Sequence, residues 1–363
     1  MSASEPAAPA GMQVLADKNY QQATLTGVSR SFAFTIPQLP DSLRASVTNA
    51  YLLCRVADTI EDHGSGPHGQ RQALFAQLAA AVERGAAEQE LAQQLLRQLS
   101  AQAPPAEREL VRNLPRLLRI NAALPEAHRR TIIRCVDLLA AGMARFDTLK
   151  SATGLANQAL FDDYCYHVAG VVGELLTALF CDYSPQMAQR RAEMMKLAVA
   201  FGQGLQMTNI LKDVWEDRAA GVCWLPRDVF ARHGCMLQAQ ADWRTDPGFQ
   251  AGMREMLANA RGHLEAALQY TLLIPPQEAG IRRFCSWAAG MALLTLRRIA
   301  ERPDFSAQHQ VKISRRQVAR IVAISNLAVH RDWTLRAAFW LAALGLPPAP
   351  PHDQNKKAIA DTG

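Results

Sequence analysis

Residues 205–217 constrain the fold of this chain more than any other stretch. Read as a helix, they place Asn209, Asp213 and Asp217 at positions i, i+4 and i+8, so the three side chains lie above one another on one face. Stacked carboxylates repel one another, and a carboxylate against an apolar core is costly unless something pairs with it. The pattern therefore predicts a largely apolar helix whose acidic face binds a hard divalent cation such as Mg²⁺, which prefers carboxylates together with a substrate's phosphates.

A second acidic stretch has the same form. Asp58 and Asp62 are four residues apart, Glu61 lies on the same edge, and Arg55 and Tyr51 precede them by about one and two helical turns on nearly the same face. One such pair is usually a solvated helix face, whereas two pairs on separate apolar helices favour a common function. Facing each other across a cavity, the two helices would bind Mg²⁺ ions that hold a diphosphate and help it leave as an anion.

The composition predicts an all-α protein. Of the 363 residues, 49% are hydrophobic and 20% charged, which suits a globular protein with a large core. Ala, Leu, Arg, Gln and Glu dominate between the Pro and Gly breaks, and β-branched runs are few. We expect a disordered leader over residues 1–18, one helical domain over 19–346 and a flexible tail over 347–363.

Charge and cysteine usage exclude several classes. The net charge of +6 is modest, and no Lys/Arg tract marks a nucleic-acid-binding surface. The seven cysteines form no Cys-x-x-Cys pair, so we interpret them as buried thiols in a reducing cytosol and expect neither a disulfide framework nor a zinc site. No obligatory protein partner is implied.

No segment resembles a signal peptide, and no apolar run reaches the roughly 20 residues that span a bilayer. The apolar run 337–346 is interpreted as a last core helix, with contact to a membrane surface as the alternative. We therefore expect a cytoplasmic protein that is at most peripheral to a membrane.

Three helices can be predicted from breaks and periodicity. Residues 41–63 should form one helix, with Asp41 or Ser42 as its N-cap. Residues 158–180 should form a long apolar helix whose Gly170 and Gly173 indicate close approach of another backbone or of a ligand. Residues 188–217 should form the helix that carries the acidic face described first.

Ionisation of a substrate bound through such a diphosphate would leave a carbocation, which needs an apolar pocket without water. Phe32 and Phe284 are candidates to stabilise it with their ring faces, although sequence alone favours simple core packing for either residue. Tyr164 begins an apolar segment and is either a proton donor and acceptor or a core tyrosine.

Basic side chains accompany the acidic pairs. Arg30, Arg55 and Lys212 would hold diphosphate or neutralise a neighbouring Asp. Lys312, with Arg315 and Arg316, would bind a phosphorylated cofactor or form a solvated loop.

Three segments, 29–32, 51–62 and 206–217, resemble signatures of the squalene/phytoene synthase family and occur in that family's order. The resemblance extends over about residues 20–330. It implies a single-domain, all-α isoprenoid synthase bundle with a central cavity. Segments 164–173, 284–296 and 311–317 are similar to the squalene-forming branch. That branch implies Mg²⁺-dependent head-to-head coupling of two farnesyl diphosphates to presqualene diphosphate, followed by NADPH-dependent reduction to squalene.

By position, the resemblance also implies roles for single residues. The expected Mg²⁺ ligands are Asp58, Glu61, Asp62, Asp213 and Asp217, of which Asp58 and Asp213 count as catalytic. The expected diphosphate-binding residues are Arg30, Ser31, Tyr51, Arg55 and Gln206. The expected NADPH-binding residues are Asn209, Lys212, Lys312 and Arg315. Tyr164 would act as acid and base in the first half-reaction, and Phe32 and Phe284 would guard the cation.

The chain departs from the family pattern at two positions. Lys212 stands where the family usually has Arg, and Val222 follows Gly221 where the family again usually has Arg. Lys provides a point charge without the bidentate fork of Arg. Alternatives therefore stay open: an enzyme that stops at presqualene diphosphate, one that makes dehydrosqualene or phytoene without a reductant, and a catalytically silent helical assembly factor.

Overall fold

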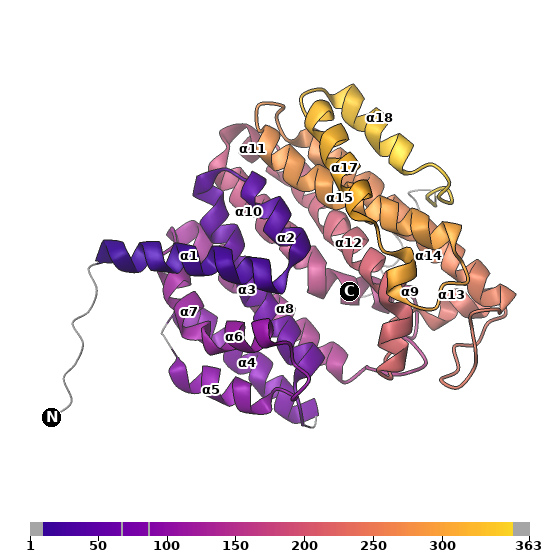
Figure 1. Cartoon of the computed structure of the whole chain (residues 1–363), viewed down its shortest axis with the longest axis horizontal. Coiled ribbons are helices and arrows are strands. Elements are labelled where there is room, and N and C mark those ends of the chain that lie inside the picture. Colours follow the sequence, from indigo (N-terminus) through magenta and orange to yellow (C-terminus); the bar gives the residue numbers. More distant parts are fainter. Residues whose placement is uncertain (1–9, 67, 86–87, 351–363) are drawn as a thin grey trace. The chain divides into compact units, whose positions relative to one another are not determined.

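The computed structural model describes residues 10–66, 68–85 and 88–350, and within these ranges the regular structure is helical (Figure 1). The only extended pairings there are two isolated bridges, Gly64 with Leu99 and Leu155 with Pro226. The predicted all-α class is confirmed. Residue contacts divide the chain into two compact units, Met1–Ala144 and Arg145–Gly363, called unit 1 and unit 2 below.

Unit 1 is organised around α3 (Asp41–His63), which packs against helices α1, α4, α6 and α7. The other elements are α1 (Ala10–Val28), α2 (Arg30–Thr35), the 3-10 turn η1 (Ile36–Gln38), α4 (His68–Arg84), α5 (Gln89–Gln98), α6 (Pro105–Arg112), α7 (Leu114–Ala122) and α8 (Glu126–Asp147). One face of α3 carries Leu52, Leu53, Val56 and Ile60, all fully buried. Burial of this apolar face, and not helix propensity alone, stabilises a helix that also carries an acidic end.

The structure confirms the predicted bounds of 41–63 but corrects the predicted N-cap. The N-cap position is Pro40, which makes no side-chain capping bond, while Asp41 lies in the first turn and pairs with Arg44 at 2.9 Å. Helix α1 begins at Ala10, inside the stretch 1–18 that was expected to be a leader, and residues 1–9 lie outside the described residues. Asp17, within that leader, is buried and accepts a hydrogen bond from Arg116 Nε at 2.6 Å. Because the two residues are 99 positions apart, no local sequence pattern predicts this ion pair.

Unit 2 is organised around α12 (Arg191–Ala219), which packs against α10, α14 and α15. The other elements are α9 (Gln158–Cys165), the π-helical turn η2 (Tyr166–Gly170), α10 (Val171–Tyr183), α11 (Pro185–Gln189), α13 (Arg227–Arg232), α14 (Pro247–Leu273), α15 (Ala279–Glu301), α16 (Gln308–Val311), α17 (Arg315–Ala328) and α18 (Asp332–Ala342). The helix predicted over 188–217 therefore exists with its start three residues later and its end two residues later.

The expected close approach at glycines of the 158–180 segment is confirmed, and its partner is the backbone of α12. A Cβ on Gly173 would lie 2.1 Å from the carbonyl oxygen of Ala198, and one on Gly202 would lie 2.2 Å from that of Ala169. The segment is not one α-helix as predicted, because η2 inserts a π turn between α9 and α10. Wider i→i+5 turns of this kind are frequent at functional sites.

Among the described residues, one helical run, Gln158–Tyr183, is long and apolar enough to cross a bilayer. Half of its most apolar window is buried inside the structure. The apolar run 337–346 was predicted to be a core helix, and this was wrong for most of its large side chains: Trp340, Leu341 and Leu344 of α18 and the following turn are exposed.

Candidate active site

The acidic end of α3 combines a carboxyl and a guanidinium. Arg55 Nη1 lies 3.4 Å from Asp58 Oδ2. Burial raises the pKa of Asp58 to about 7, Arg55 opposes this shift, and the charge of Asp62 adds to it. One arginine thus does not compensate the cost of ionising this carboxyl. A divalent cation bound to Asp58 would offset this cost, because its charge stabilises the ionised carboxylate directly. Glu61 is half-buried and Asp62 exposed on the same helix.

Arg55 is held by Glu107, a residue that the sequence reading missed. Glu107, from α6, is buried and pairs with Arg55 Nη2 at 2.5 Å. Its other oxygen accepts a hydrogen bond from Thr59 Oγ1 at 3.2 Å and lies 3.6 Å from His63 Nε2. A sequence signal existed, since Glu107 shares the face of α6 that carries the buried Leu110 and Val111, where an acid needs a partner.

The predicted diphosphate-binding residues of unit 1 partly converge. The ring of Phe32 lies 4.6 Å from that of Tyr51, centroid to centroid, so α2 is held against α3. Burial raises the pKa of Tyr51 to about 12, while its contacts with Ser29 and Arg55 lower it. Ser29 also caps α2 by accepting the Phe32 backbone N–H at 3.1 Å. Ser31 is exposed on this short helix, and the side chain of Arg30 lies outside the described residues.

The acidic end of α12, like that of α3, places a carboxyl beside a basic side chain. Lys212 Nζ lies 3.2 Å from Asp213 Oδ2 and 3.5 Å from Asn209 Oδ1. Burial raises the pKa of Asp213, Lys212 lowers it, and Glu216 raises it further. Within the described part of the chain, the other carboxylate oxygen, Oδ1, is buried and makes no hydrogen bond. A buried acceptor of this kind costs about 1–3 kcal/mol, which a bound cation would offset.

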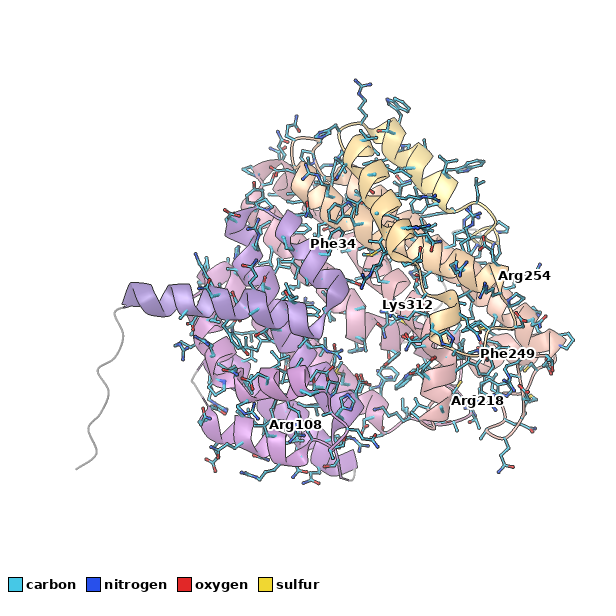
Figure 2. All side chains as sticks on the ribbon, in the orientation of Figure 1. Phe34, Arg108, Arg218, Phe249, Arg254 and Lys312 are labelled. Carbon is cyan, nitrogen blue, oxygen red and sulfur yellow. The ribbon has the colours of Figure 1, made fainter. Side chains whose placement is uncertain are left out.

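Glu216 links α12 to the segment that precedes Lys312, which was predicted to bind the cofactor. Glu216 Oε1 accepts a hydrogen bond from the Gln308 backbone N–H at 2.8 Å, so α16 packs on α12. Lys312 follows α16 and lowers the pKa of Asp213 through its charge. Figure 2 shows Lys312 beside α12. The structure thus brings Lys312 close to the acidic end of α12, which carries Asn209 and Lys212 of the same predicted set.

Other predicted positions are less closely grouped. Gln206 is half-buried on α12, and Asp217, also half-buried, accepts the Val222 backbone N–H at 2.9 Å through its carbonyl oxygen. Arg315 is exposed in the first turn of α17. Val222, where the family pattern has Arg, is half-buried and adds no charge near α12.

Tyr164 and Phe284 are both buried among rings. Tyr164 stacks on Trp224, with ring centroids 4.0 Å apart, and meets the edge of Phe146 at 5.1 Å. Trp224 is a neighbour that the sequence reading did not assign. Phe284 lies edge-to-face with Phe180, its centroid 6.3 Å away. Aromatic pairs at these separations fix ring orientation as well as filling space.

The donors present fit magnesium, although neither acidic end forms a closed protein site. Among the described residues, no group of three or more His, Cys, Asp or Glu is placed to hold a metal ion. Mg²⁺ usually binds one or two carboxylates and completes its octahedron with waters and phosphate oxygens. Asp58, with its raised pKa, and Asp213, with its unbonded Oδ1, suit such a partial ligand set.

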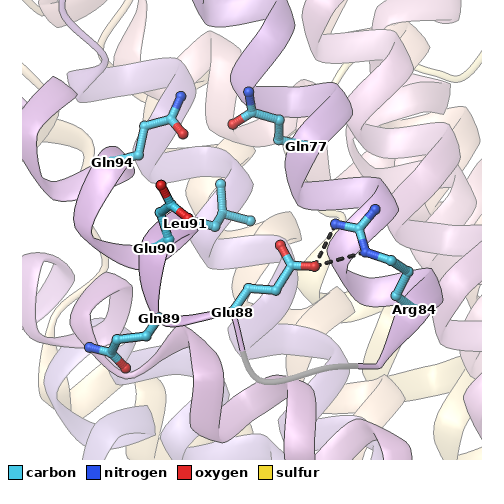
Figure 3. Close-up of a pocket in the computed structure, with 7 residues that line it drawn as sticks. All are labelled: Gln77, Arg84, Glu88, Gln89, Glu90, Leu91 and Gln94. Atoms are coloured by element: carbon cyan, nitrogen blue, oxygen red, sulfur yellow. Dashed lines mark hydrogen bonds and ion pairs between the residues drawn. The ribbon is translucent and has the colours of Figure 1, made fainter.

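A surface hollow between α4 and α5 is not part of this chemistry (Figure 3). Arg84 and Glu88 form an ion pair at its edge, with Arg84 Nε 2.8 Å from Glu88 Oε1. Its remaining walls are formed by Gln77, Gln89, Glu90, Leu91 and Gln94. None of the predicted site residues lines it.

Comparison with known proteins gives these residues a context. The family model described as squalene/phytoene synthase matches residues 25–317. Squalene synthase of Schizosaccharomyces pombe is 28% identical over 326 residues, covering 87% of this chain and 66% of that protein. Botryococcus squalene synthase of Botryococcus braunii is 28% identical over 304 residues, covering 82% and 61%. The chain spans less than two thirds of the length of these curated relatives.

Solved structures agree on the fold. A complex of TcSQS with a ligand has a TM-score of 0.73 at 24% identity, covering 95% of this chain and 96% of that one. A dehydrosqualene synthase complex has a TM-score of 0.64 at 20% identity, covering 86% and 96%. These likenesses confirm the predicted isoprenoid synthase helical fold. Since the family model also matches most of the residues, including both acidic stretches, the chain belongs to the squalene/phytoene synthase family.

Proposed function

We propose that this protein is a prenyltransferase that couples two farnesyl diphosphates head to head to presqualene diphosphate, and then reduces that intermediate to squalene with NADPH. The observation that carries the proposal is the shared chemistry of the two acidic helix ends. Each has a carboxyl whose pKa is raised by burial, beside one basic side chain that only partly compensates it.

In the proposed reaction, Asp58 and Asp213 are the principal Mg²⁺ ligands, supported by Glu61, Asp62 and Asp217. Bound Mg²⁺ would neutralise the diphosphate as it departs with the electron pair of the C–O bond. Arg55 adds a fixed charge for that anion, because Glu107 holds Nη2 of its guanidinium while Asp58 pairs with Nη1. Tyr51 contributes a phenol that stays protonated, since its pKa lies near 12.

In the proposed reaction, aromatic and apolar residues exclude water from the cationic carbon. Phe32 and Phe284 would present ring faces or edges to it, as cation–π contacts require. Tyr164 would act as acid and base in the first half-reaction, giving its phenolic proton to the departing diphosphate and taking the proton that the coupling releases. Its stacking on Trp224 fixes the plane of its ring, which supports a defined position for its hydroxyl.

The reductive step is assigned to Asn209, Lys212, Lys312 and Arg315. NADPH would supply the hydride, and these side chains would bind and orient it. Lys312 and Lys212 both lower the pKa of Asp213, so both carry positive charge at the acidic end of α12. Because Lys212 is engaged by Asp213 and Asn209, a second candidate is kept: an enzyme that releases presqualene diphosphate or dehydrosqualene without NADPH.

Product analysis decides between these readings. The purified chain is incubated with farnesyl diphosphate and Mg²⁺, with and without NADPH, and with geranylgeranyl diphosphate in parallel. Squalene that forms only with NADPH supports the proposal. Accumulation of presqualene diphosphate in its presence favours the second candidate, and better turnover of geranylgeranyl diphosphate points to phytoene synthesis.

Two variants test the site itself. Asp58→Asn and Asp213→Asn should each lower turnover by at least a hundredfold, while Asp304→Asn, an exposed acid outside both helices, should leave it unchanged. All three should retain the wild-type circular dichroism spectrum. Unaltered turnover in the first two would reject the assignment, and no product from any folded form would favour a silent assembly factor.

A further inference from the structure

The last two helices of unit 2 expose an unusual set of apolar side chains. Six of the ten exposed large apolar residues among those described lie on α17, α18 and the turn that follows. Leu327 is 83% exposed, Trp333 65% and Trp340 63%. The other three are Ile324, Leu341 and Leu344. Isolated exposed residues are normal, but six on two helices that contact each other indicate an interaction surface.

Helical periodicity places three of these six side chains, Trp333, Trp340 and Leu344, along one line of α18 and the turn that follows it. Trp333, Ala337, Trp340 and Leu344 follow one another at i, i+4, i+7 and i+11. The opposite face carries the buried Leu335, which packs with Ala328, Val329 and Leu272. In helix α18 the largest apolar side chains therefore face solvent, whereas the smaller Leu335 is buried. Figure 1 shows it as the outermost helix over α15 and α17.

The same surface is basic. Arg316 and Arg320 share a face of α17 with Leu327, and Arg336 lies beside the tryptophans on α18. All three arginines are exposed. The one acid on these helices, Asp332, pairs with Arg282 at 2.9 Å and is compensated within the fold. We name the exposed apolar residues and these three arginines the α17–α18 surface.

Two occupants from the chain itself fit poorly. A second copy docked by a two-fold axis would set the arginines of one surface against those of the other. Residues 351–363 contain a single large apolar residue, Ile359, which is too little to cover two tryptophans and three leucines. By contrast, tryptophan and leucine flanked by arginine match a membrane–water interface, where amphipathic rings lie at the headgroups and cations meet anionic lipid.

We propose that the α17–α18 surface docks this protein on a bilayer that contains anionic lipid, with Trp333 and Trp340 entering the headgroup boundary. The helices lie in the plane of the surface and do not span it. The inference uses none of the residues assigned to the proposed reaction and does not depend on it.

Vesicle binding by the full chain tests the proposal. Wild-type protein should co-sediment with phosphatidylcholine vesicles that contain phosphatidylglycerol, and much less with phosphatidylcholine alone. Trp333→Gln/Trp340→Gln should lower the partition coefficient at least tenfold. Arg316→Gln/Arg320→Gln should lower it about 25-fold on anionic vesicles, since each cation near such a surface contributes about fivefold. Met236→Gln and Arg97→Gln/Arg191→Gln, exposed elsewhere, should match wild type.

A second readout needs no substitution. Brominated phosphatidylcholine in anionic vesicles should quench part of the wild-type tryptophan emission, because Trp224, Trp243 and Trp287 are buried and Trp333 and Trp340 are not. Failure of the wild type to bind anionic vesicles would overturn the proposal. So would equal binding by both double variants, or a dimer that the tryptophan substitutions convert to monomer without any change in vesicle binding.

Discussion

Substitution of Glu107 by Gln should weaken the anchor that holds Arg55 beside Asp58. The side chain of Glu107 is buried and makes a 2.5 Å ion pair with Arg55 and a 3.2 Å hydrogen bond with Thr59. A hydrogen bond to a charged group contributes about 1.5–3 kcal/mol. Gln retains the shape of Glu and one acceptor, and Arg55 still pairs with Asp58 at 3.4 Å. We therefore expect the free energy of unfolding to fall by an amount near the lower end of this range, about 2 kcal/mol.

The measurement is urea unfolding of the wild type, Glu107→Gln, Arg55→Gln and the double variant. A double-mutant cycle should give a coupling of about 1–2 kcal/mol between the two side chains. The apparent KM for farnesyl diphosphate should also rise, since Arg55 would be less firmly oriented. Glu109→Gln is the matched control, because Glu109 is an exposed residue of the same helix and pairs with Arg112 and Asn113 three and four residues further along. A Glu107 variant as stable as this control, with no coupling to Arg55, would refute the reasoning.

Three further predictions follow from single features. Because the folded pKa of Asp58 is raised to about 7 from an ordinary value near 3.8, the folded state binds the extra proton, so metal-free protein should lose stability as pH rises from about 4 to 7. Thermal melts in a chelator should show this slope, Asp58→Asn should flatten it, and an equally steep slope in that variant would contradict the assignment. Gly173→Ala should destabilise by about 1–3 kcal/mol or more, since its Cβ would meet the Ala198 carbonyl at 2.1 Å. Gly69→Ala, with open space around it in α4, should be neutral or stabilising by up to about 1 kcal/mol in the same urea assay, and equal effects at both sites would count against the packing argument. Lys212→Arg should raise the ratio of squalene to presqualene diphosphate at limiting NADPH several-fold, because Arg offers a bidentate fork; an unchanged ratio would remove Lys212 from cofactor binding.

Local sequence patterns determined the helical class, the bounds of α3 and the acidic faces. Asp58 with Asp62 and Asp213 with Asp217 fall at helical spacing, which follows from 3.6 residues per turn and needs no tertiary information. Gly173 likewise predicted a close backbone contact. A glycine destabilises a helix, so its presence inside one indicates that the close packing of another segment requires it.

The partners of those residues were decided only by the tertiary structure. Glu107 reaches Arg55 across 52 positions of sequence, and Glu216 reaches Gln308 across 92. The stacking of Tyr164 on Trp224 and the outward face of α18 likewise depend on packing between distant segments. Periodicity shows which face of a helix is apolar or charged. It does not show what that face meets, because long-range contacts are selected by the fit of whole elements, and that fit sets both the raised pKa of Asp58 and the exposure of Trp333 and Trp340.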